Sequence, residues 1–463
     1  MLVDRLANYA VWLRTATFPQ GVEYAAKRCM IDWFAALLPG GILPPATLLL
    51  QALRDDLNAS DAVIFPRGDT ASMRTAALIN GSAAHTVEFD DIYRDALYHP
   101  GAPVIAAALA ASQARHTSGD TLLRGVIAGY EISNRIGVAI NPAHYEYWHT
   151  TGTVGTFGAT AAAAVILGLD EEQIAHALAN AGTFAAGLQQ AFRSDAMSKP
   201  LHAGRAAETG VLVALAAEQG VTGAKDILEG PRGFGAAMSE DADWYGAFAG
   251  LRERFTITRT TQKNHGACGH TFAAVDAVIA LRQQHELSAL SAWNIKSIEV
   301  GTYAKALEIT GNTKPRTAFE AKFSLPYCAA VALLTGQVRL NAFAPERLND
   351  PLVHEIMSRV SLHVDDKIES EFPRRRAATV KIKTVDGKRY RYHADTRKGD
   401  PDNPLSDAEL TAKYRELAVP VIGQRPAESL LDLHWRLETL KDTTRLRTGR
   451  QTTEAVGFTS TGV

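Results

Sequence analysis

The sequence has few cysteines and no long apolar run. Its three cysteines, Cys29, Cys268 and Cys328, are odd in number and widely spaced, so we expect no disulfide framework. A reducing, cytoplasmic setting is therefore predicted. No segment approaches the roughly 18 uninterrupted apolar residues of a membrane helix. The opening stretch, MLVDRLANYAVWLR, carries an early acid, and we do not expect it to be a signal peptide.

The sequence also lacks an excess of either charge. Lys and Arg together number 48, against 50 for Asp and Glu, so neither nucleic acid nor an anionic membrane is an expected partner. An anionic ligand would need a local cluster of cations. The chain has 463 residues, of which 46% are hydrophobic, and this predicts two or three units with a large packed core.

Several signatures of cofactor enzymes are absent. The sequence has no G-x-x-x-x-G-K-[ST] loop, no strand–GxGxxG–helix unit, no G-x-S-x-G elbow and no cysteine run of the iron–sulfur type. A dehydration could therefore not use an iron–sulfur cluster as its Lewis acid. Side chains would have to supply both the acid and the base.

Residues 1–262 are predicted to be helical. Alanine-rich stretches recur throughout this part, and alanine is both the strongest helix former and small enough for close helix contacts. The spacing Gly152-x-x-Gly155-x-x-Gly158 favours two helices that approach closely.

Residues 263–400 are predicted to form a smaller α+β unit. β-branched residues and alternation appear in NIKSIEVGTYAKALEI, VSLHVDD and ATVKIKTVDGKRYRYHA. Val385, Asp386 and Gly387 lie between two alternating runs, which predicts a β-hairpin.

Residues 401–463 are predicted to return to the helical unit. Ser406 and Glu409 form a capping box at a helix start. The last stretch, TGRQTTEAVGFTSTGV, is polar and is expected to be a loose tail. The expected fold is mostly α, with an all-helical domain of residues 1–262 plus 401–463 and an inserted α+β domain of residues 263–400.

A polar cluster, HTVEFDDIYRDALYHPGAP, lies between two alanine-rich helices. Its acids could bind a metal or orient a histidine, or the stretch could be a solvated loop. The position favours function, because a buried acid there needs a partner. The polar side chains are His85, Glu88, Asp90, Asp91, Arg94 and His99.

A second cluster, HYEYWHTTGTVGTFG, places His149 near a helix N-terminus, where an anionic ligand binds well. A structural histidine is the alternative. Tyr145 and Tyr147 directly precede it.

A third cluster, RSDAMSKPLHAGRAAETG, could clamp carboxylates through Arg193, Lys199, His202 and Arg205. The alternative is a basic surface turn.

In a fourth cluster, His265, Cys268 and His270 surround two glycines. The spacing resembles half of a zinc site, but no second cluster supplies the remaining ligands. A histidine pair at the start of a helix suits acid–base work better. Cys268 is expected to be a small buried residue in a tight turn.

Taken together, these segments resemble the MmgE/PrpD family over nearly the whole chain. The family includes 2-methylcitrate dehydratase, cis-aconitate decarboxylase and iminodisuccinate epimerase. The resemblance implies a helical domain with an inserted α+β lid, a homodimer, no metal, no organic cofactor and a site between the domains. It is carried by CMIDWFAALLPG, HTVEFDDIYRDALYHPGAPV, HTTGTVGTFGATAAAAVILGL, SKPLHAGRAAETGVLVALAAEQGVTG, GACGHTFAAVDA and GDPDNPLSDAELTAKY.

The resemblance also carries over site residues. It points to the acidic motif, four histidines, a lysine and a pocket tyrosine, and it leaves open which histidine of the fourth cluster belongs to the lid. These positions are Glu88, Asp90, Asp91, His99, His149, Lys199, His265, His270 and Tyr327.

Three departures from the family pattern weaken a decarboxylase assignment. The usual D-F-D-D of the family is E-F-D-D here, and Ile92 stands where the decarboxylase has a hydroxyl residue. The loop to His99 also looks one residue longer.

The expected substrate is a small di- or tricarboxylate. Lys199, with Arg193 or Arg94, would neutralise its carboxylates. His149 would take the α-proton.

His99, oriented by Asp90 or Asp91, would be the second acid–base group, and His265, His270 and Tyr327 would close over the site. Dehydration of the 2-methylcitrate type is favoured. Epimerisation, with Tyr145 or Tyr147 as a second acid, decarboxylation and a non-catalytic binding role are the alternatives.

Overall fold

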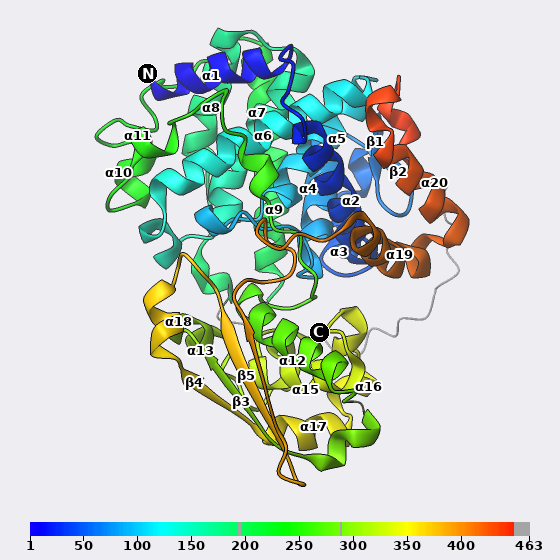
Figure 1. Cartoon of the computed structure of the whole chain (residues 1–463). Helices are drawn as coiled ribbons and strands as arrows, with labels where there is room; N and C mark the ends of the chain where they lie inside the picture. Colours follow the sequence, from blue (N-terminus) through cyan, green and yellow to red (C-terminus); the bar gives the residue numbers. More distant parts are fainter. Residues whose placement is uncertain (193–195, 288, 449–463) are drawn as a thin grey trace. The chain divides into compact units, whose positions relative to one another are not determined.

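The computed structural model describes residues 1–192, 196–287 and 289–448 (Figure 1). Within them the backbone separates into two compact units. The first joins Met1–Gln262 to the segment that begins at Ser406, and the second is Lys263–Leu405. Helices dominate and strands are few, so the predicted fold class, mostly α, is confirmed.

The first unit is a bundle of helices built from both ends of the chain. Many of its buried residues are alanines, whose small side chains let the helix backbones pack closely. The helices are α1 (Leu2–Leu13), α2 (Val22–Gly40), α3 (Ala46–Ala52), α4 (Met73–Thr86), α5 (Gly101–Ala114), α6 (Gly119–Ile140), α7 (Thr150–Leu167), α8 (Glu171–Phe184), α9 (Ser198–Glu218), α10 (Phe234–Met238), α11 (Trp244–Ala247), α19 (Asp407–Ile422) and α20 (Gln424–Trp435).

Helix α7 is the centre of this bundle and packs against α5, α6, α8 and α9. The predicted role of its glycines is confirmed. A methyl group on Gly155 would lie 2.7 Å from Cγ of Pro103, and one on Gly158 would lie 2.7 Å from Oγ of Ser133. No side chain larger than hydrogen fits at these two crossings without displacing a neighbour.

By length and composition alone, α7 could also cross a membrane. However, 94% of the window that meets this criterion is buried inside the protein. The helix owes its apolar character to its neighbours in the bundle, because a helix that is surrounded on all sides is apolar all round.

The first unit is not entirely helical, and the prediction that residues 1–262 hold only helices is wrong in one place. β1 (Leu57–Ile64) and β2 (Asp69–Ala71) form an antiparallel two-stranded ribbon. The N–H of Val63 donates to Oε1 of Gln113 on α5 at 2.9 Å. The buried run at the end of β1 is short, and periodicity alone cannot distinguish such a run from a buried helix.

The C-terminal helices return to the first unit, where α19 packs against α2 (Figure 1). The predicted capping box is present, since Ser406 accepts from the N–H of Glu409 and the Glu409 side chain accepts from the N–H of Ser406. The predicted loose tail lies outside the described residues from position 449 onward.

The second unit is a four-stranded sheet with helices packed on one face. The strand order is β4-β3-β5-β6, with β3 parallel to β4 and antiparallel to β5. Its elements are α12 (Phe272–Gln284), β3 (Ile295–Thr302), α13 (Ala304–Thr310), α14 (Ala318–Lys322), α15 (Leu325–Thr335), α16 (Pro345–Leu348), α17 (Pro351–Ser358), β4 (Val360–Val364), α18 (Asp366–Glu371), β5 (Ala378–Thr384) and β6 (Arg389–Ala394).

The predicted hairpin of this unit is confirmed. β5 and β6 pair in register up to Lys383 and Arg389, and Gly387 in the turn has a φ of +91°. Ile298 and Val300 of β3 face the same core as Val380 of β5, together with apolar residues of α12 and α15. The alternation that predicted these strands therefore corresponds to one buried sheet face.

Candidate active site

The loop after α4 brings two histidines onto one carboxylate oxygen. Oδ2 of Asp90 lies 2.7 Å from Nδ1 of His85, at the end of α4, and 3.4 Å from Nδ1 of His99, just before α5. The rings of His85 and His99 are 4.9 Å apart. Burial alone would raise the pKa of Asp90, but the two histidines hold it well below its usual range. Asp90 is therefore an ionised group that orients both rings.

A third histidine joins this pair from the start of α7. His149 is the residue that caps α7, and its ring stacks on that of His85 at 5.4 Å. Burial, together with His85 and the Lys199 ammonium group, holds the pKa of His149 well below its ordinary value. His149 is therefore neutral near pH 7, the state that a proton-accepting base requires.

His202, in the first turns of α9, contacts His149 directly. Their two Nδ1 atoms are 3.0 Å apart, so the Nδ1–H of one ring donates a hydrogen bond to the unprotonated Nδ1 of the other. Burial lowers the pKa of His202 to about 4, which makes this ring neutral as well. If His149 donates from Nδ1, its Nε2 carries no proton and can act as the base.

A buried cation lies on the same turn of α9 as this histidine. Lys199 precedes His202 by three residues and forms an ion pair with Glu88. Burial opposes the charge on Lys199, but Glu88 raises its pKa, so the side chain stays protonated. Glu88 has a backbone φ of +60°. Residues other than glycine rarely adopt this conformation, and it persists only where the surrounding structure imposes it.

Asp91 has a different role from Asp90. Its Oδ1 accepts from the N–H of Gly101 at 2.9 Å, and its Oδ2 accepts from the hydroxyl of Tyr130 at 2.6 Å. Of the two acids that could orient His99, Asp90 is the one that contacts it. Asp91 instead fixes the start of α5. Burial raises the pKa of Asp91 to about 8, so this acid is protonated at neutral pH.

Asp91→Asn is expected to remove a pH-dependent loss of stability. The folded pKa of about 8 exceeds the unfolded value of about 3.9, so the folded state retains a proton that the unfolded state releases. Between these values the wild-type free energy of unfolding should fall relative to the variant by about 1.4 kcal/mol per pH unit. Urea titrations at pH 5, 6 and 7 measure this slope. A difference that does not change with pH would mean that Asp91 is ionised in the folded protein.

Three further residues of this unit are predicted to contact substrate. Arg94, on a 3₁₀ turn (Arg94–Ala96), pairs with Asp95 at 3.5 Å. Tyr145 lies on the turn before α7 and contributes to the electrostatic environment of Lys199. Arg193 lies outside the described residues. The predicted contacts of these three residues with substrate remain predictions.

In the second unit, the two histidines of HGACGH have different surroundings. His265 is buried, and its Nε2 lies 2.8 Å from Oδ1 of Asp276. His270 is partly exposed, and its Nδ1 lies 2.7 Å from the hydroxyl of Tyr303. Desolvation and the cations of Arg376, Arg397 and Lys305 hold the pKa of His270 well below its usual range.

Tyr327 is a core residue of the second unit. It is fully buried, and its hydroxyl donates to the carbonyl oxygen of Ala342 at 2.5 Å. Its polar atom is thus used inside the core, and the role of Tyr327 as a pocket residue remains a prediction. Tyr303, which no sequence pattern indicated, places its hydroxyl beside Nδ1 of His270.

His85, Asp90 and His99 could in principle hold a metal, since their nearest ligand atoms all lie within 4.8 Å of one another. Tetrahedral ligands at about 2.1 Å from zinc stand about 3.4 Å apart. The 2.7 Å between His85 and Asp90 is instead a hydrogen-bond distance. The arrangement therefore fits a hydrogen bond between His85 and Asp90 better than a metal ion bound by both.

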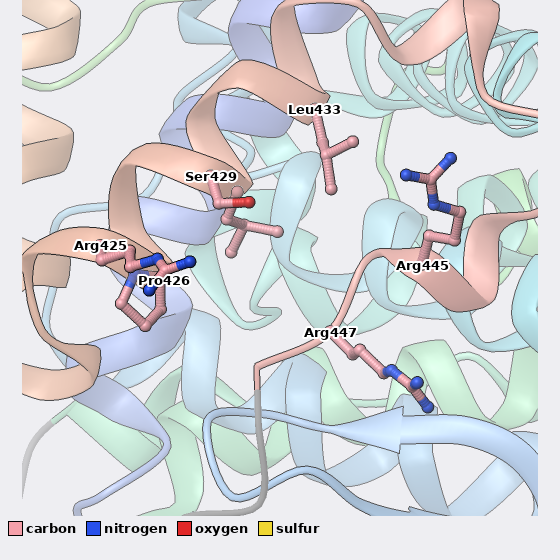
Figure 2. A pocket seen from close by; sticks show the side chains of 7 residues that line it. Arg425, Pro426, Ser429, Leu433, Arg445 and Arg447 are labelled. Carbon is pink, nitrogen blue, oxygen red and sulfur yellow. The ribbon is translucent and has the colours of Figure 1, made fainter.

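A separate surface hollow of about 280 Å³ lies at α20 and the following turn (Figure 2). Arg425, Arg445 and Arg447 line it, with Pro426 and Leu433 between them. Arginine stays charged at any pH the protein meets, so this hollow offers no group that exchanges protons near neutrality. The histidine cluster of His85, His99, His149 and His202 therefore suits acid–base chemistry better than this hollow does.

Two family models match the chain. The MmgE/PrpD N-terminal domain matches residues 4–246 and the MmgE/PrpD C-terminal domain matches residues 265–439. The chain belongs to the MmgE/PrpD family.

Curated relatives of this MmgE/PrpD protein are named as cis-aconitate decarboxylases. The human protein is 30% identical over 81% of this chain and 78% of its own length. The mouse protein is 29% identical over 79% and 76%. A protein of Aspergillus terreus is 25% identical over 95% and 94%. The family and these relatives support an enzyme of the lyase class.

Local spacing in the sequence could have indicated two more histidines of the candidate site of this MmgE/PrpD protein, His85 and His202. His85 and Asp90 are five residues apart across a helix end, and Lys199 and His202 are one turn apart on a helix. Both spacings bring polar side chains together in otherwise apolar sequence. The contact of His202 with His149 spans 53 residues and has no local signal.

Proposed function

We propose that this protein is a lyase that acts on a small polycarboxylate through the histidine cluster of its first unit, without a metal or an organic cofactor. The observation that carries the proposal is a buried ammonium group, Lys199, beside His149, a histidine that burial keeps neutral. A substrate carboxylate would pair with Lys199 in place of Glu88, and charge-assisted contacts of this kind fix its orientation.

Decarboxylation of cis-aconitate ranks first, because the relatives bear that name. In such a reaction the bond to one carboxylate breaks, carbon dioxide leaves and the electron pair remains on the carbon chain. A proton from a histidine neutralises that pair. His99, held against ionised Asp90, can carry such a proton because the carboxylate favours the charged imidazolium.

Dehydration of the 2-methylcitrate type ranks second. It is favoured by Ile92, a buried apolar residue at the position where the decarboxylase carries a hydroxyl. Here His149 would take the α-proton and His99 would protonate the leaving hydroxyl. Dehydration needs a base, an acid and a cation, whereas the decarboxylation step needs only the acid and the cation, so the cluster holds the groups for either reaction.

Proton NMR in D₂O distinguishes these reactions. The purified full chain would be mixed, in the presence of EDTA, with cis-aconitate, citrate, 2-methylcitrate, malate, tartrate and iminodisuccinate. Loss of carbon dioxide from cis-aconitate with deuterium in the product supports the first reaction, and vinyl signals from 2-methylcitrate support the second. Exchange with inversion would replace the lyase proposal by an epimerase. No change in any of the acids would contradict the proposed substrate class.

A further inference from the structure

The motif GDPDNPLSDAELTAKY leads to a buried lysine that the proposed chemistry does not use. Lys413, on α19, is completely buried. Its Nζ donates to Oδ1 of Asp32 on α2 at 2.6 Å and to the carbonyl oxygen of Phe89 at 2.8 Å. The same Nζ lies 4.4 Å from the centre of the Phe89 ring. Two of these three contacts are with one residue of the acidic loop.

Phe89 stands between the two acids of that loop that meet the candidate site. Glu88 pairs with Lys199, and Asp90 contacts His85 and His99. A peptide unit is planar, so a carbonyl oxygen held in place also fixes the following N–H and the direction of the next Cα. The Phe89 carbonyl belongs to the peptide that enters Asp90.

The loop needs such a restraint. Glu88 has the left-handed φ of +60°, which non-glycine residues adopt only where neighbouring contacts impose it. On one side its carboxylate is held by Lys199. On the other, the backbone after Phe89 is held by Lys413. The two lysines thus restrain the loop from α9 and from α19.

We propose that Lys413 is a positioning residue of the candidate active site: its ammonium group holds the peptide between Phe89 and Asp90 and so sets the approach of Asp90 to His85 and His99. The proposal rests on the proposed function in that it takes these histidines to be the acid–base groups. Under this proposal, Lys413 on α19 influences catalysis through Asp90 and does not itself contact the substrate.

A second contact between the same two helices provides a matched control. Asp407, at the start of α19, forms an ion pair with Arg28 and accepts a hydrogen bond from Tyr24, both on α2. Asp407 is half exposed, and its side chain bonds to α2 and not to the acidic loop. Its loss weakens the contact between α2 and α19 but leaves the Phe89 carbonyl in place.

The test compares Lys413→Met/Asp32→Asn with Asp407→Asn in the full chain. The double variant removes one positive and one negative charge together, so no buried charge is left unpaired. Hydrogen–deuterium exchange of peptides that cover residues 85–100 measures the loop. Exchange at residues 88–91 is expected to rise about tenfold or more, the effect of losing a hydrogen bond to a charged group. In the same variant kcat is expected to fall by a similar factor, with KM changing less.

Asp407→Asn is expected to retain wild-type loop exchange and wild-type kcat even where its melting temperature falls. Unchanged loop exchange in the double variant would overturn the positioning role, as would a loss of kcat that Asp407→Asn matches. If the wild-type chain transforms none of the six acids, the proposed function fails instead. The exchange measurement then still decides whether Lys413 holds the loop.

Discussion

His149→Gln is expected to lower turnover by about 10²–10⁴-fold, the usual contribution of a well-placed acid–base group. Glutamine has a similar size, and the His149 side chain makes no capping hydrogen bond to α7 that would be lost, so the fold should persist. What it cannot do is accept a proton near neutral pH. Steady-state kinetics with the substrate found by NMR measures the loss, and circular dichroism checks the fold. A variant with near-wild-type turnover would contradict the assignment of the base.

His144→Gln is the matched control for this variant. His144 is also buried and also lies beside the start of α7. Its two ring nitrogens lie 2.8 Å from the carbonyl oxygen of Met238 and 2.7 Å from Oγ1 of Thr153, so both serve the fold. Burial lowers its pKa to about 4, as a buried histidine without a role in proton transfer would also show. We expect a lower melting temperature with turnover little changed.

The second large effect is expected on binding. Removing the Lys199 ammonium group should lower kcat/KM by about 10²–10³-fold, since the substrate carboxylate would then be buried without a cation, and an uncompensated buried charge costs about 3–5 kcal/mol. Lys199→Met alone would also leave Glu88 as an unpaired buried charge. The variant to measure is therefore Lys199→Met/Glu88→Gln, in which that penalty is absent.

Glu88→Gln alone is the comparison for this double variant. It keeps the cation and removes the internal carboxylate that competes with substrate, so KM should stay the same or fall. The two variants differ only in the ammonium group. Equal kcat/KM values in the two would assign carboxylate binding to another residue.

The acidic loop illustrates what can be predicted from sequence. Its alanine-rich flanks and its dense set of polar residues indicate a functional stretch, and the sequence pattern alone places His149 at a helix start, where the structure has it. These are local signals. The division of labour between Asp90 and Asp91 stays open in the sequence, because it depends on where Tyr130 and Gly101 lie. Neighbours that distant in sequence leave no trace in a single pattern.

Tyr327, in the second unit, shows what a sequence motif leaves open. Its motif resemblance predicts a pocket residue, whereas its hydroxyl donates to a backbone carbonyl within the core. A tyrosine in an apolar helix fits either role, since its ring is hydrophobic and its hydroxyl needs one partner. Tyr303 escapes a sequence-based search because it directly follows a strand and belongs to no polar cluster. Only the pairing of that strand with its neighbours sets the position of its side chain.

Because the first unit is closed by helices from the end of the chain, it cannot be completed early in protein synthesis. Residues 1–262 leave the ribosome first, but Lys413 follows only after the whole of Lys263–Leu405. At about 5–20 residues per second, that insertion alone delays α19 by roughly 7–30 s. During this time the buried carboxylate of Asp32 lacks its ammonium partner. A nascent or truncated chain would thus have the histidines without the Lys413 contact to their acidic loop. If Lys413 has the proposed positioning role, we expect activity to appear only once α19 has been synthesised.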